Sequence, residues 1–279
     1  MPELPEVETV RRGAEPHLVG RRVRGVELRR DDLRWPIPVD AVHGLVGRTC
    51  TAVTRRSKYL LAHFDGPGTP VLLVHLGMTG RMFVDVVAPR ATPPEWRKHE
   101  HWRIDLGDRL LRFVDPRRFG ALDVASGDRL DEHPLLCKLG PEPFDERFSA
   151  DYLHAATRTR KVATKVLLMD AHLVVGVGNI YASEACWRAG VRPRRRAGSL
   201  SRAECAALVA AIREVLQAAI DAGGTSFRDY VGVAEDAGFF ARQLAVYERE
   251  GQTCTRCGGV VRRTVDGGRS TYWCASCQR

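Results

Sequence analysis

The sequence predicts an α+β fold in which a strand-rich N-terminal domain precedes a helical domain and a small cysteine-bearing hairpin. Three observations support this prediction. Short β-branched and aromatic stretches separated by Gly and Pro dominate the first ~125 residues. Beyond the segment 139–144, the apolar residues recur with the spacing of an α-helix. Four cysteines near the C-terminus then form two Cys-x2-Cys pairs.

Length and charge agree with a soluble protein of about two domains. The chain has 279 residues, 44% of them hydrophobic, which is enough for each domain to bury its own core. The 43 Lys and Arg residues exceed the 34 Asp and Glu residues, and the net charge of +9 is consistent with a polyanionic partner. No apolar run approaches the ~18–20 residues of a membrane span. Because the acidic, Pro-rich start lacks the features of a secretory signal, we expect an intracellular protein.

The N-terminal part is expected to contain one helix and a series of strands. The helix is expected at 6–12, and Gly107-Asp108 is a plausible two-residue hairpin turn. The expected strands are 23–28, 52–64, 71–75, 82–87, 101–106 and 109–114. The Gly- and Pro-containing stretch 139–144 ends this pattern. We therefore expect an N-terminal domain at 1–138, a linker at 139–148, a helical domain at 149–243 and a C-terminal unit at 244–279.

The helical part has one clear helix and two shorter ones. Ser201 and Glu204 form a capping box ahead of a long apolar helical pattern. The segments 161–170 and 180–189 read as the shorter helices. Asn179 precedes the second of them and is expected to be its N-cap. Because a helix N-terminus offers free N–H groups and a positive dipole end, this position is a candidate phosphate site.

The paired cysteines predict a metal site. Cys254 and Cys257 are separated by sixteen residues from Cys274 and Cys277, with a predicted hairpin between the pairs. This spacing is typical of a zinc ribbon, in which four thiolates bind one tetrahedral Zn²⁺. A pair of disulfides is the alternative, but an intracellular chain favours zinc. Four cysteine ligands leave no open position for catalysis, so the zinc is expected to be structural.

Lysine is scarce among the cations of this chain. Only five of the 43 are Lys, namely Lys58, Lys98, Lys138, Lys161 and Lys165. An Arg-rich genome explains most of this bias. Because an ammonium group can give up a proton and a guanidinium effectively cannot, each remaining Lys is a candidate for a task that Arg cannot perform.

The first residues carry a second candidate for chemistry. Removal of Met1 would leave Pro2 with a free secondary amine, which is partly unprotonated near neutral pH. Such an amine can attack the anomeric carbon of a sugar and form an iminium. Glu3 beside it can transfer protons. The simpler interpretation is that Pro2 and Pro5 only begin a helix, and the dipeptide alone favours that view.

Six motifs in one order favour the chemical interpretation. They are MPELPEVETVRRG at the start, RRSKYL at 55–60, HLGMTG at 75–80, DPRRFG at 115–120, VGVGNIYA at 175–182 and the terminal Cys-x2-Cys pairs. Together they closely resemble the bacterial formamidopyrimidine-DNA glycosylases over essentially the whole chain. The resemblance implies an N-terminal β-sandwich, a helix–two-turn–helix domain and a zinc ribbon. It also implies a bifunctional enzyme of base excision repair, a DNA glycosylase and abasic-site lyase, that excises oxidised purines such as 8-oxoguanine and formamidopyrimidines.

The resemblance further assigns the catalytic residues. Pro2 would be the nucleophile, Glu3 the proton donor that helps to open the sugar, and Lys58 the donor in β-elimination. Arg269 matches the residue assigned to δ-elimination, although phosphate anchoring is an equally physical role for a guanidinium.

The remaining candidates concern DNA. A base inside a duplex must be flipped out before it can be excised, and side chains that refill the gap offset the cost. Met78, Arg117 and Phe119 match the family's void-filling residues, whereas core packing is the alternative for Met78 and Phe119. His99, Arg160 and Asn179 match phosphate contacts, whereas a solvated surface role is the alternative for His99 and Arg160. We expect a monomer that binds double-stranded DNA of the nucleoid in the cytoplasm.

The sequence leaves open how the damaged base is recognised, and it leaves two alternative functions. The segment 225–242 corresponds to the loop that closes over the flipped base, and its Glu235 and Asp236 depart from the more basic or neutral stretch common in the family. Base discrimination is therefore the weakest part of the resemblance. An endonuclease VIII-like enzyme for oxidised pyrimidines and a non-catalytic zinc-ribbon DNA-binding protein are the two alternatives.

Overall fold

The structure is a computed structural model that describes residues 2–87, 94–224, 240 and 243–279. These residues form two compact units, which are considered separately. Glu6–Cys137 and Pro2 form a β-rich unit. Glu3–Pro5 belongs with residues 138–224, 240 and 243–279 in a helical unit that includes the cysteine hairpin. Within the described ranges, no helix is long and apolar enough to cross a membrane.

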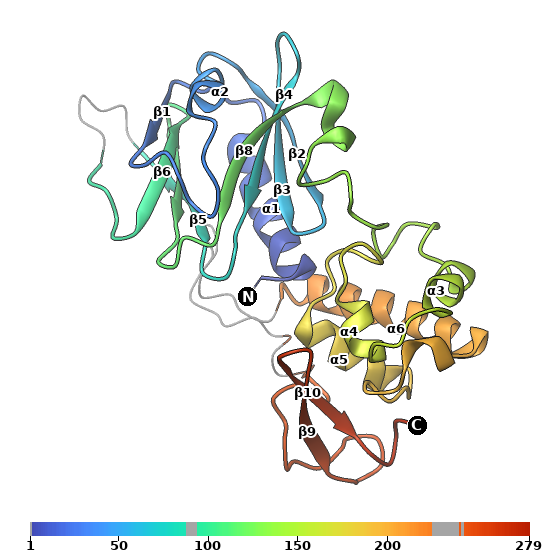
Figure 1. Cartoon of the computed structure of the whole chain (residues 1–279). Helices are drawn as coiled ribbons and strands as arrows, with labels where there is room; N and C mark the ends of the chain where they lie inside the picture. Colours follow the sequence, from blue (N-terminus) through green and yellow to red (C-terminus); the bar gives the residue numbers. More distant parts are fainter. Residues whose placement is uncertain (1, 88–93, 225–239, 241–242) are drawn as a thin grey trace. The chain divides into compact units, whose positions relative to one another are not determined.

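The β-rich unit contains two four-stranded antiparallel sheets (Figure 1). Their strand orders are β1-β6-β7-β5 and β2-β3-β4-β8. The strands are β1 (Gly25–Leu28), β2 (Cys50–Arg56), β3 (Tyr59–Phe64), β4 (Pro70–His75), β5 (Arg81–Val86), β6 (Glu100–Asp105), β7 (Arg109–Val114) and β8 (Ala121–Ser126). Its helical segments are α1 (Leu4–Leu18), α2 (Val39–His43) and the 3-10 segment η1 (Gly127–Glu132). One apolar core joins residues of both sheets, as the predicted sandwich requires.

Helix α1 closes this core. Val7, Val10, Ala14 and Leu18 follow the 3.6-residue period and are all buried in the cluster shared with the two sheets. The helix is longer than the expected 6–12 at both ends. It includes Pro5 because a missing N–H costs nothing in the first turn, and it continues to Leu18 because Ala14 and Leu18 add to its buried face.

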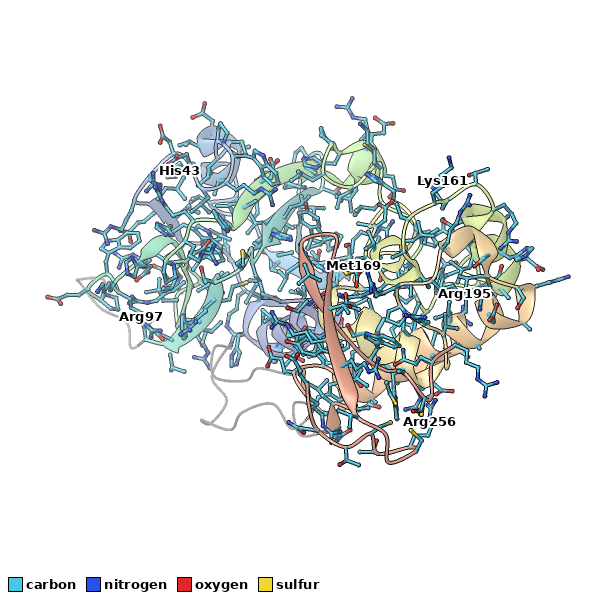
Figure 2. The ribbon with its side chains drawn as sticks, turned by 60° about the horizontal axis from the view of Figure 1, so that its bottom comes forward. His43, Arg97, Lys161, Met169, Arg195 and Arg256 are labelled. Carbon is cyan, nitrogen blue, oxygen red and sulfur yellow. The ribbon has the colours of Figure 1, made fainter. Side chains whose placement is uncertain are left out.

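The helical unit contains α3 (Ala150–Thr157), α4 (Thr164–Leu168), α5 (Asn179–Arg188), the short 3-10 turn η2 (Ala197–Ser199) and α6 (Arg202–Asp221), followed by the hairpin of β9 (Val261–Asp266) and β10 (Arg269–Cys274) (Figure 1). The capping box of α6 is present, since Ser201 accepts from the backbone of Glu204 and the Glu204 side chain accepts from that of Ser201. Arg195, labelled in Figure 2, pairs with the same Glu204 carboxylate. This fixes the loop before α6.

Several predicted elements differ in extent. The expected strand 52–64 is two strands, because Ser57 adopts a left-handed φ of 56° and turns the chain between β2 and β3. The expected helix 161–170 shortens to α4, since Lys161 lies exposed ahead of it (Figure 2). Strand β8 and the helices α2 and α3 were not predicted. The strand contains two Ala and one Asp, which are depleted in strands, and the helices have only five and eight residues.

The predicted linker 139–148 is packed rather than extended. The Arg213 guanidinium of α6 donates to the carbonyls of Pro143, Asp145 and Phe148, and the Phe148 side chain is fully buried in the helical unit. The division between the units falls between Cys137 and Lys138. The domain boundaries themselves stay a prediction.

Candidate active site and zinc centre

The Glu3 carboxylate is anchored at the N-terminus of α5. The backbone N–H of Gly178 donates to Glu3 Oε2 at 2.7 Å, and that of Ile180 donates to Oε1 at 3.1 Å. Glu3 is only 2% exposed. A Cβ at position 178 would lie 2.2 Å from Glu3 Cδ, so only glycine permits this approach. Backbone donors and the helix dipole together stabilise a buried carboxylate here.

The prediction that Asn179 is the N-cap of α5 is wrong. Gly178 occupies the cap with an extended backbone, and Asn179 is the first helical residue. The cap needs no side chain of its own, because Glu3 accepts the free N–H groups from outside the helix. This frees the Asn179 amide for other contacts.

The Asn179 amide is directed to Tyr247. Its side chain bonds the Tyr247 hydroxyl, although burial outweighs this bond and raises the pKa of Tyr247. The Asn179 Oδ1 atom is buried and has no hydrogen-bond partner among the described residues. The Tyr247 segment is held by Glu184 of α5, whose buried carboxylate accepts the N–H groups of Ala245, Val246 and Tyr247 at 2.8–2.9 Å. Sequence reasoning missed Tyr247 and Glu184, because neither lies in a recognisable motif.

Pro2 directly precedes this anchored segment. It is half-buried, and the Leu4 N–H two residues later donates to the Gly176 carbonyl at 3.1 Å. The covalent chain therefore keeps the Pro2 nitrogen within one residue of the fixed Glu3 carboxylate.

Arg269 lies at the tip of the β9–β10 hairpin. It is exposed and faces Asp266 across the two-residue turn. The next two residues of β10 are tied to α4, because the buried Lys165 ammonium donates to the Ser270 carbonyl at 2.8 Å and to Thr271 Oγ1 at 2.9 Å. Burial lowers the pKa of Lys165 to about 8, and the Arg269 charge adds to this effect. Lys165 is one of the five lysines in an Arg-rich chain, which was the signal in the sequence.

Lys58 lies in the β2–β3 turn of the β-rich unit. It is half-buried, and its charge acts on His75 at the end of β4. The Gly77 N–H donates to His75 Nδ1 at 3.0 Å, which requires that nitrogen to be unprotonated. Burial, with the charges of Lys58 and Arg34, lowers the pKa of His75 to about 4. Lys58 is thus placed beside a neutral imidazole.

This low pKa predicts acid-sensitive stability. Between pH 6.5 and 4 the unfolded chain binds a proton at His75 and the folded chain does not, so stability falls as the pH decreases through this window. His75→Gln removes that dependence. We expect the unfolding free energy of wild type to lose about 2–3 kcal/mol relative to His75→Gln between pH 7 and 4, measured by urea denaturation. Equal pH dependence of the two proteins contradicts the prediction; His43→Gln, an exposed histidine, is the control.

Met78 and Phe119 lie on two loops that touch. Gly77, with a left-handed φ of 63°, packs so closely that a Cβ there would lie 2.3 Å from the Phe119 carbonyl carbon. Asp115 joins the loops, since it accepts from Thr79 Oγ1 at 2.5 Å and from the Gly120 N–H at 2.7 Å. The Met78 and Phe119 side chains remain 39% and 41% exposed. Core packing is therefore excluded as their role.

The other predicted DNA contacts lie on exposed backbone turns. The Arg117 guanidinium stacks 4.7 Å from the centre of the Phe119 ring. His99 is exposed at a left-handed φ of 62°, and its carbonyl accepts the Asp115 N–H at 2.9 Å. This bond connects the His99 turn to the Phe119 loop. Arg160 is exposed after α3 in the helical unit.

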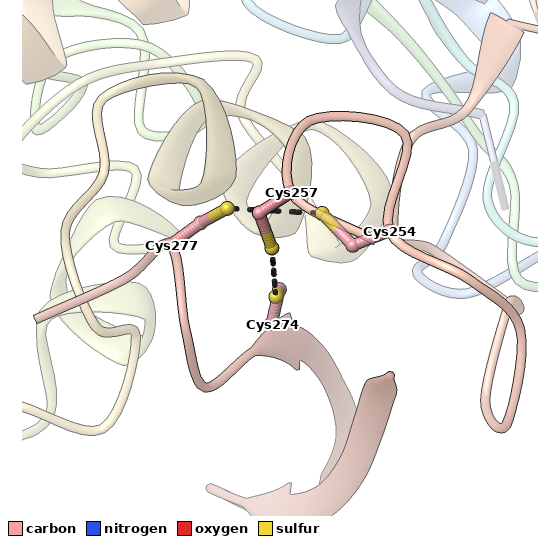
Figure 3. Close-up of side chains that lie close together, drawn as sticks. All are labelled: Cys254, Cys257, Cys274 and Cys277. Carbon is pink, nitrogen blue, oxygen red and sulfur yellow. Dashed lines mark hydrogen bonds between the residues drawn. The ribbon is translucent and has the colours of Figure 1, made fainter. Parts of the chain in front are cut away.

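The four predicted zinc ligands converge. Their sulfur atoms all lie within 4.8 Å of one another, and none of the eight cysteines forms a disulfide. Figure 3 shows two sulfur pairs, Cys254–Cys277 at 3.8 Å and Cys257–Cys274 at 3.6 Å. A tetrahedral zinc with four thiolates places the sulfurs about 3.8 Å apart. The cluster therefore fits one structural Zn²⁺. The Trp187 indole N–H donates to Cys254 Sγ and so helps to orient this ligand.

Removal of the zinc is expected to unfold the hairpin. Its apolar core is small, consisting of Val246, Val261 and two of the cysteines, so the metal supplies most of its folding energy. Cys254→Ser should lose one equivalent of zinc, measured by metal analysis, and weaken DNA binding at least about tenfold, because Arg269 loses its position. Cys137→Ser, an exposed cysteine outside the cluster, should retain the metal. Full zinc content in Cys254→Ser contradicts the assignment.

Comparison with known proteins decides the family. Residues 1–122 match the formamidopyrimidine-DNA glycosylase N-terminal domain, residues 139–231 its helix–two-turn–helix domain and residues 251–279 a zinc finger found in this family and in IleRS. The chain belongs to the formamidopyrimidine-DNA glycosylase family. It is 52% identical over 282 residues to the formamidopyrimidine-DNA glycosylase of Thioalkalivibrio sulfidiphilus, and 50% identical over 280 residues to that of Xanthomonas euvesicatoria, with full coverage of both chains.

Solved structures of glycosylases from this family match the fold of the chain. A mutant of the Lactococcus lactis glycosylase in complex with DNA containing Fapy-dG matches with a TM-score of 0.88 at 33% identity and full coverage of both chains. The Lactococcus lactis protein with DNA containing an abasic site matches with a TM-score of 0.87 at 32% identity over 99% of each chain. The α+β fold, with sandwich, helical domain and zinc ribbon, is confirmed.

Proposed function

We propose that this formamidopyrimidine-DNA glycosylase family member excises oxidised purines, including 8-oxoguanine and formamidopyrimidines, from double-stranded DNA and then cleaves the abasic strand. The observation that supports this most strongly is the buried carboxylate of Glu3, the residue that follows Pro2 in the chain, which is fixed by two N–H donors. The DNA glycosylases related to this chain at about 50% identity span its full length.

The chemistry begins at Pro2. After Met1 is removed, the Pro2 nitrogen attacks C1′ of the damaged nucleotide, the bond from C1′ to the base breaks, and the base leaves with a proton taken from solvent. Glu3 takes up the proton that the Pro2 nitrogen loses and donates it to the sugar ring oxygen, so the ring opens and an iminium links Pro2 to C1′.

Strand cleavage follows from the iminium. It acidifies the C2′ hydrogen, which is lost to solvent as a proton while the bond from C3′ to the 3′ phosphate breaks in β-elimination. Lys58 donates a proton to the leaving phosphate oxygen. Elimination of the 5′ phosphate follows, with Arg269 as donor or as the group that anchors the leaving phosphate.

Met78, Arg117 and Phe119 would fill the gap left by the flipped nucleotide. Their exposed positions on two joined loops support this role. His99, Arg160 and Asn179 would bind backbone phosphates. The segment 225–242, which would cover the flipped base, lies outside the described residues apart from Phe240. We further infer that the enzyme acts as a monomer in the cytoplasm on DNA of the nucleoid.

A lesion panel tests this function. Duplexes with 8-oxoguanine or thymine glycol are incubated with the enzyme, with and without borohydride, which reduces the iminium to a stable bond. We expect faster excision of 8-oxoguanine and a covalent adduct. Preference for thymine glycol would favour an endonuclease VIII-like enzyme. Binding of lesion DNA without any adduct would favour a non-catalytic zinc-ribbon protein.

A further inference from the structure

A second arginine–aromatic pair lies beside the Phe119 loop. Leu33 and Ile37 are buried at 8% and 5% exposure and anchor a short loop between β1 and α2. Between these anchors, Arg34 and Trp35 are exposed, and the Arg34 guanidinium lies 4.6 Å from the centre of the Trp35 ring. Trp35 is 40% exposed, whereas Trp102 is fully buried. The pair therefore presents both a positive charge and an aromatic ring to solvent.

Backbone contact places this loop against the Phe119 loop. The Arg34 N–H donates to the Gly120 carbonyl at 3.1 Å, and Gly120 directly follows Phe119. Met78 joins the same surface through the contact of Gly77 with the Phe119 backbone. Trp35, Met78 and Phe119 are thus three large exposed apolar side chains on three loops that are in contact.

The electrostatic surroundings of Arg34 also favour a role in binding an anion. The Arg34 charge lowers the pKa of His75, and it partly offsets the increase that burial causes in the pKa of Tyr59. Because Tyr59 directly follows Lys58, the guanidinium lies close to the Lys58 turn. Among the described residues, no ion pair joins Arg34 to an acid; its neighbour Asp32 is paired with Arg30. An arginine left without an acidic partner is available for an external anion.

We propose that Arg34 and Trp35 form an additional DNA-contact surface, in which the Arg34 guanidinium binds a backbone phosphate and the Trp35 ring packs against the adjoining sugar and base. The proposal rests on the proposed function and extends the surface of Met78, Arg117 and Phe119. The contribution of Arg34 to DNA affinity should decrease with increasing salt concentration, whereas the stacking contribution of Trp35 should not.

The test measures dissociation constants on a duplex with an uncleavable tetrahydrofuran abasic analogue over a range of salt concentrations. Arg34→Ala should weaken binding about tenfold and reduce the slope of log K against log salt by about one. Arg34→Lys should restore most of the slope. Trp35→Ala should weaken binding about tenfold at unchanged slope, and Trp35→Phe should recover most of it.

The side chains can be tested without disturbing the loop. The hydrogen bond to Gly120 uses the Arg34 backbone, so it survives Arg34→Ala. Arg129→Ala is the charge-matched control, because exposed Arg129 lies beyond the opposite end of β8, about 20 Å of strand from Gly120. It should change the affinity less than twofold.

The outcomes separate this inference from the proposed function. If wild type forms the borohydride adduct but Arg34→Ala and Trp35→Ala bind like wild type with the same slope, the contact surface is refuted and the enzyme assignment stands. If wild type forms no adduct, the enzyme assignment fails whatever the variants do.

Discussion

Pro2→Gly should reduce excision of 8-oxoguanine by about a hundredfold or more. The proline ring fixes the backbone at the nitrogen, and the Leu4–Gly176 and Glu3–Gly178 hydrogen bonds hold the following residues. Glycine keeps an amine but removes this restraint, and a displacement of about 1 Å at a reacting atom can cost 10²-fold in rate. Single-turnover rates and the yield of borohydride adduct measure the effect.

Two controls isolate the nucleophile. Pro5→Ala, in the first turn of α1, alters a nearby proline without touching the amine and should retain activity. A preparation that keeps Met1 blocks the Pro2 nitrogen, so the adduct yield should equal the fraction of processed protein found by intact-mass measurement. Undiminished excision by Pro2→Gly would refute the nucleophile assignment.

The fold followed from the sequence where local patterns were strong. The capping box of α6 and the paired cysteines each specify their structure through residues a few positions apart. Strand β8 was missed although other six-residue strands were predicted, because its two Ala and one Asp are depleted in strands and its pairing with β4 is set by distant contacts.

The candidate site depended on contacts that no local pattern encodes. Asn179 was assigned to the helix cap from its neighbours, yet the cap is satisfied by Glu3, more than 170 positions away. The two N–H bonds of Glu3 can be seen only in three dimensions. By contrast, the exposure of Met78 and Phe119 was predictable from the adjoining glycines, although Gly77 and Gly120 themselves are buried because the two loops touch.

The scarcity of lysine in the sequence pointed to two lysines that have distinct roles in the structure. Lys58 was singled out as an ammonium among guanidinium groups, and the structure places it beside the neutral His75. Lys165 shares the argument but performs a different task. Its buried ammonium orders β10 next to Arg269, and a branched, planar guanidinium would not fit between Ser270 and Thr271 with the same two bonds.

Glu3→Gln should separate the two activities. The carboxylate offers an acceptor to both Gly178 and Ile180, whereas glutamine offers one oxygen and turns an NH₂ donor towards the other N–H. It also removes the acidic proton needed to open the sugar. We expect excision of 8-oxoguanine to fall by about 10²–10⁴. Glu15→Gln, at the half-exposed end of α1, is the matched control and should act like wild type.

Abasic DNA provides the discriminating substrate for Glu3→Gln. Its sugar already exists partly as the open aldehyde, so Pro2 can form the iminium without proton donation to a ring oxygen. Adduct formation on abasic DNA should therefore persist while excision from 8-oxoguanine is lost. A parallel loss on both substrates, with unchanged binding and melting temperature, would mean that Glu3 acts by positioning Pro2 and not as the proton donor. Equal excision by Glu3→Gln and wild type would remove Glu3 from the mechanism, because a carboxylate buried at a helix N-terminus would then serve only to cap α5.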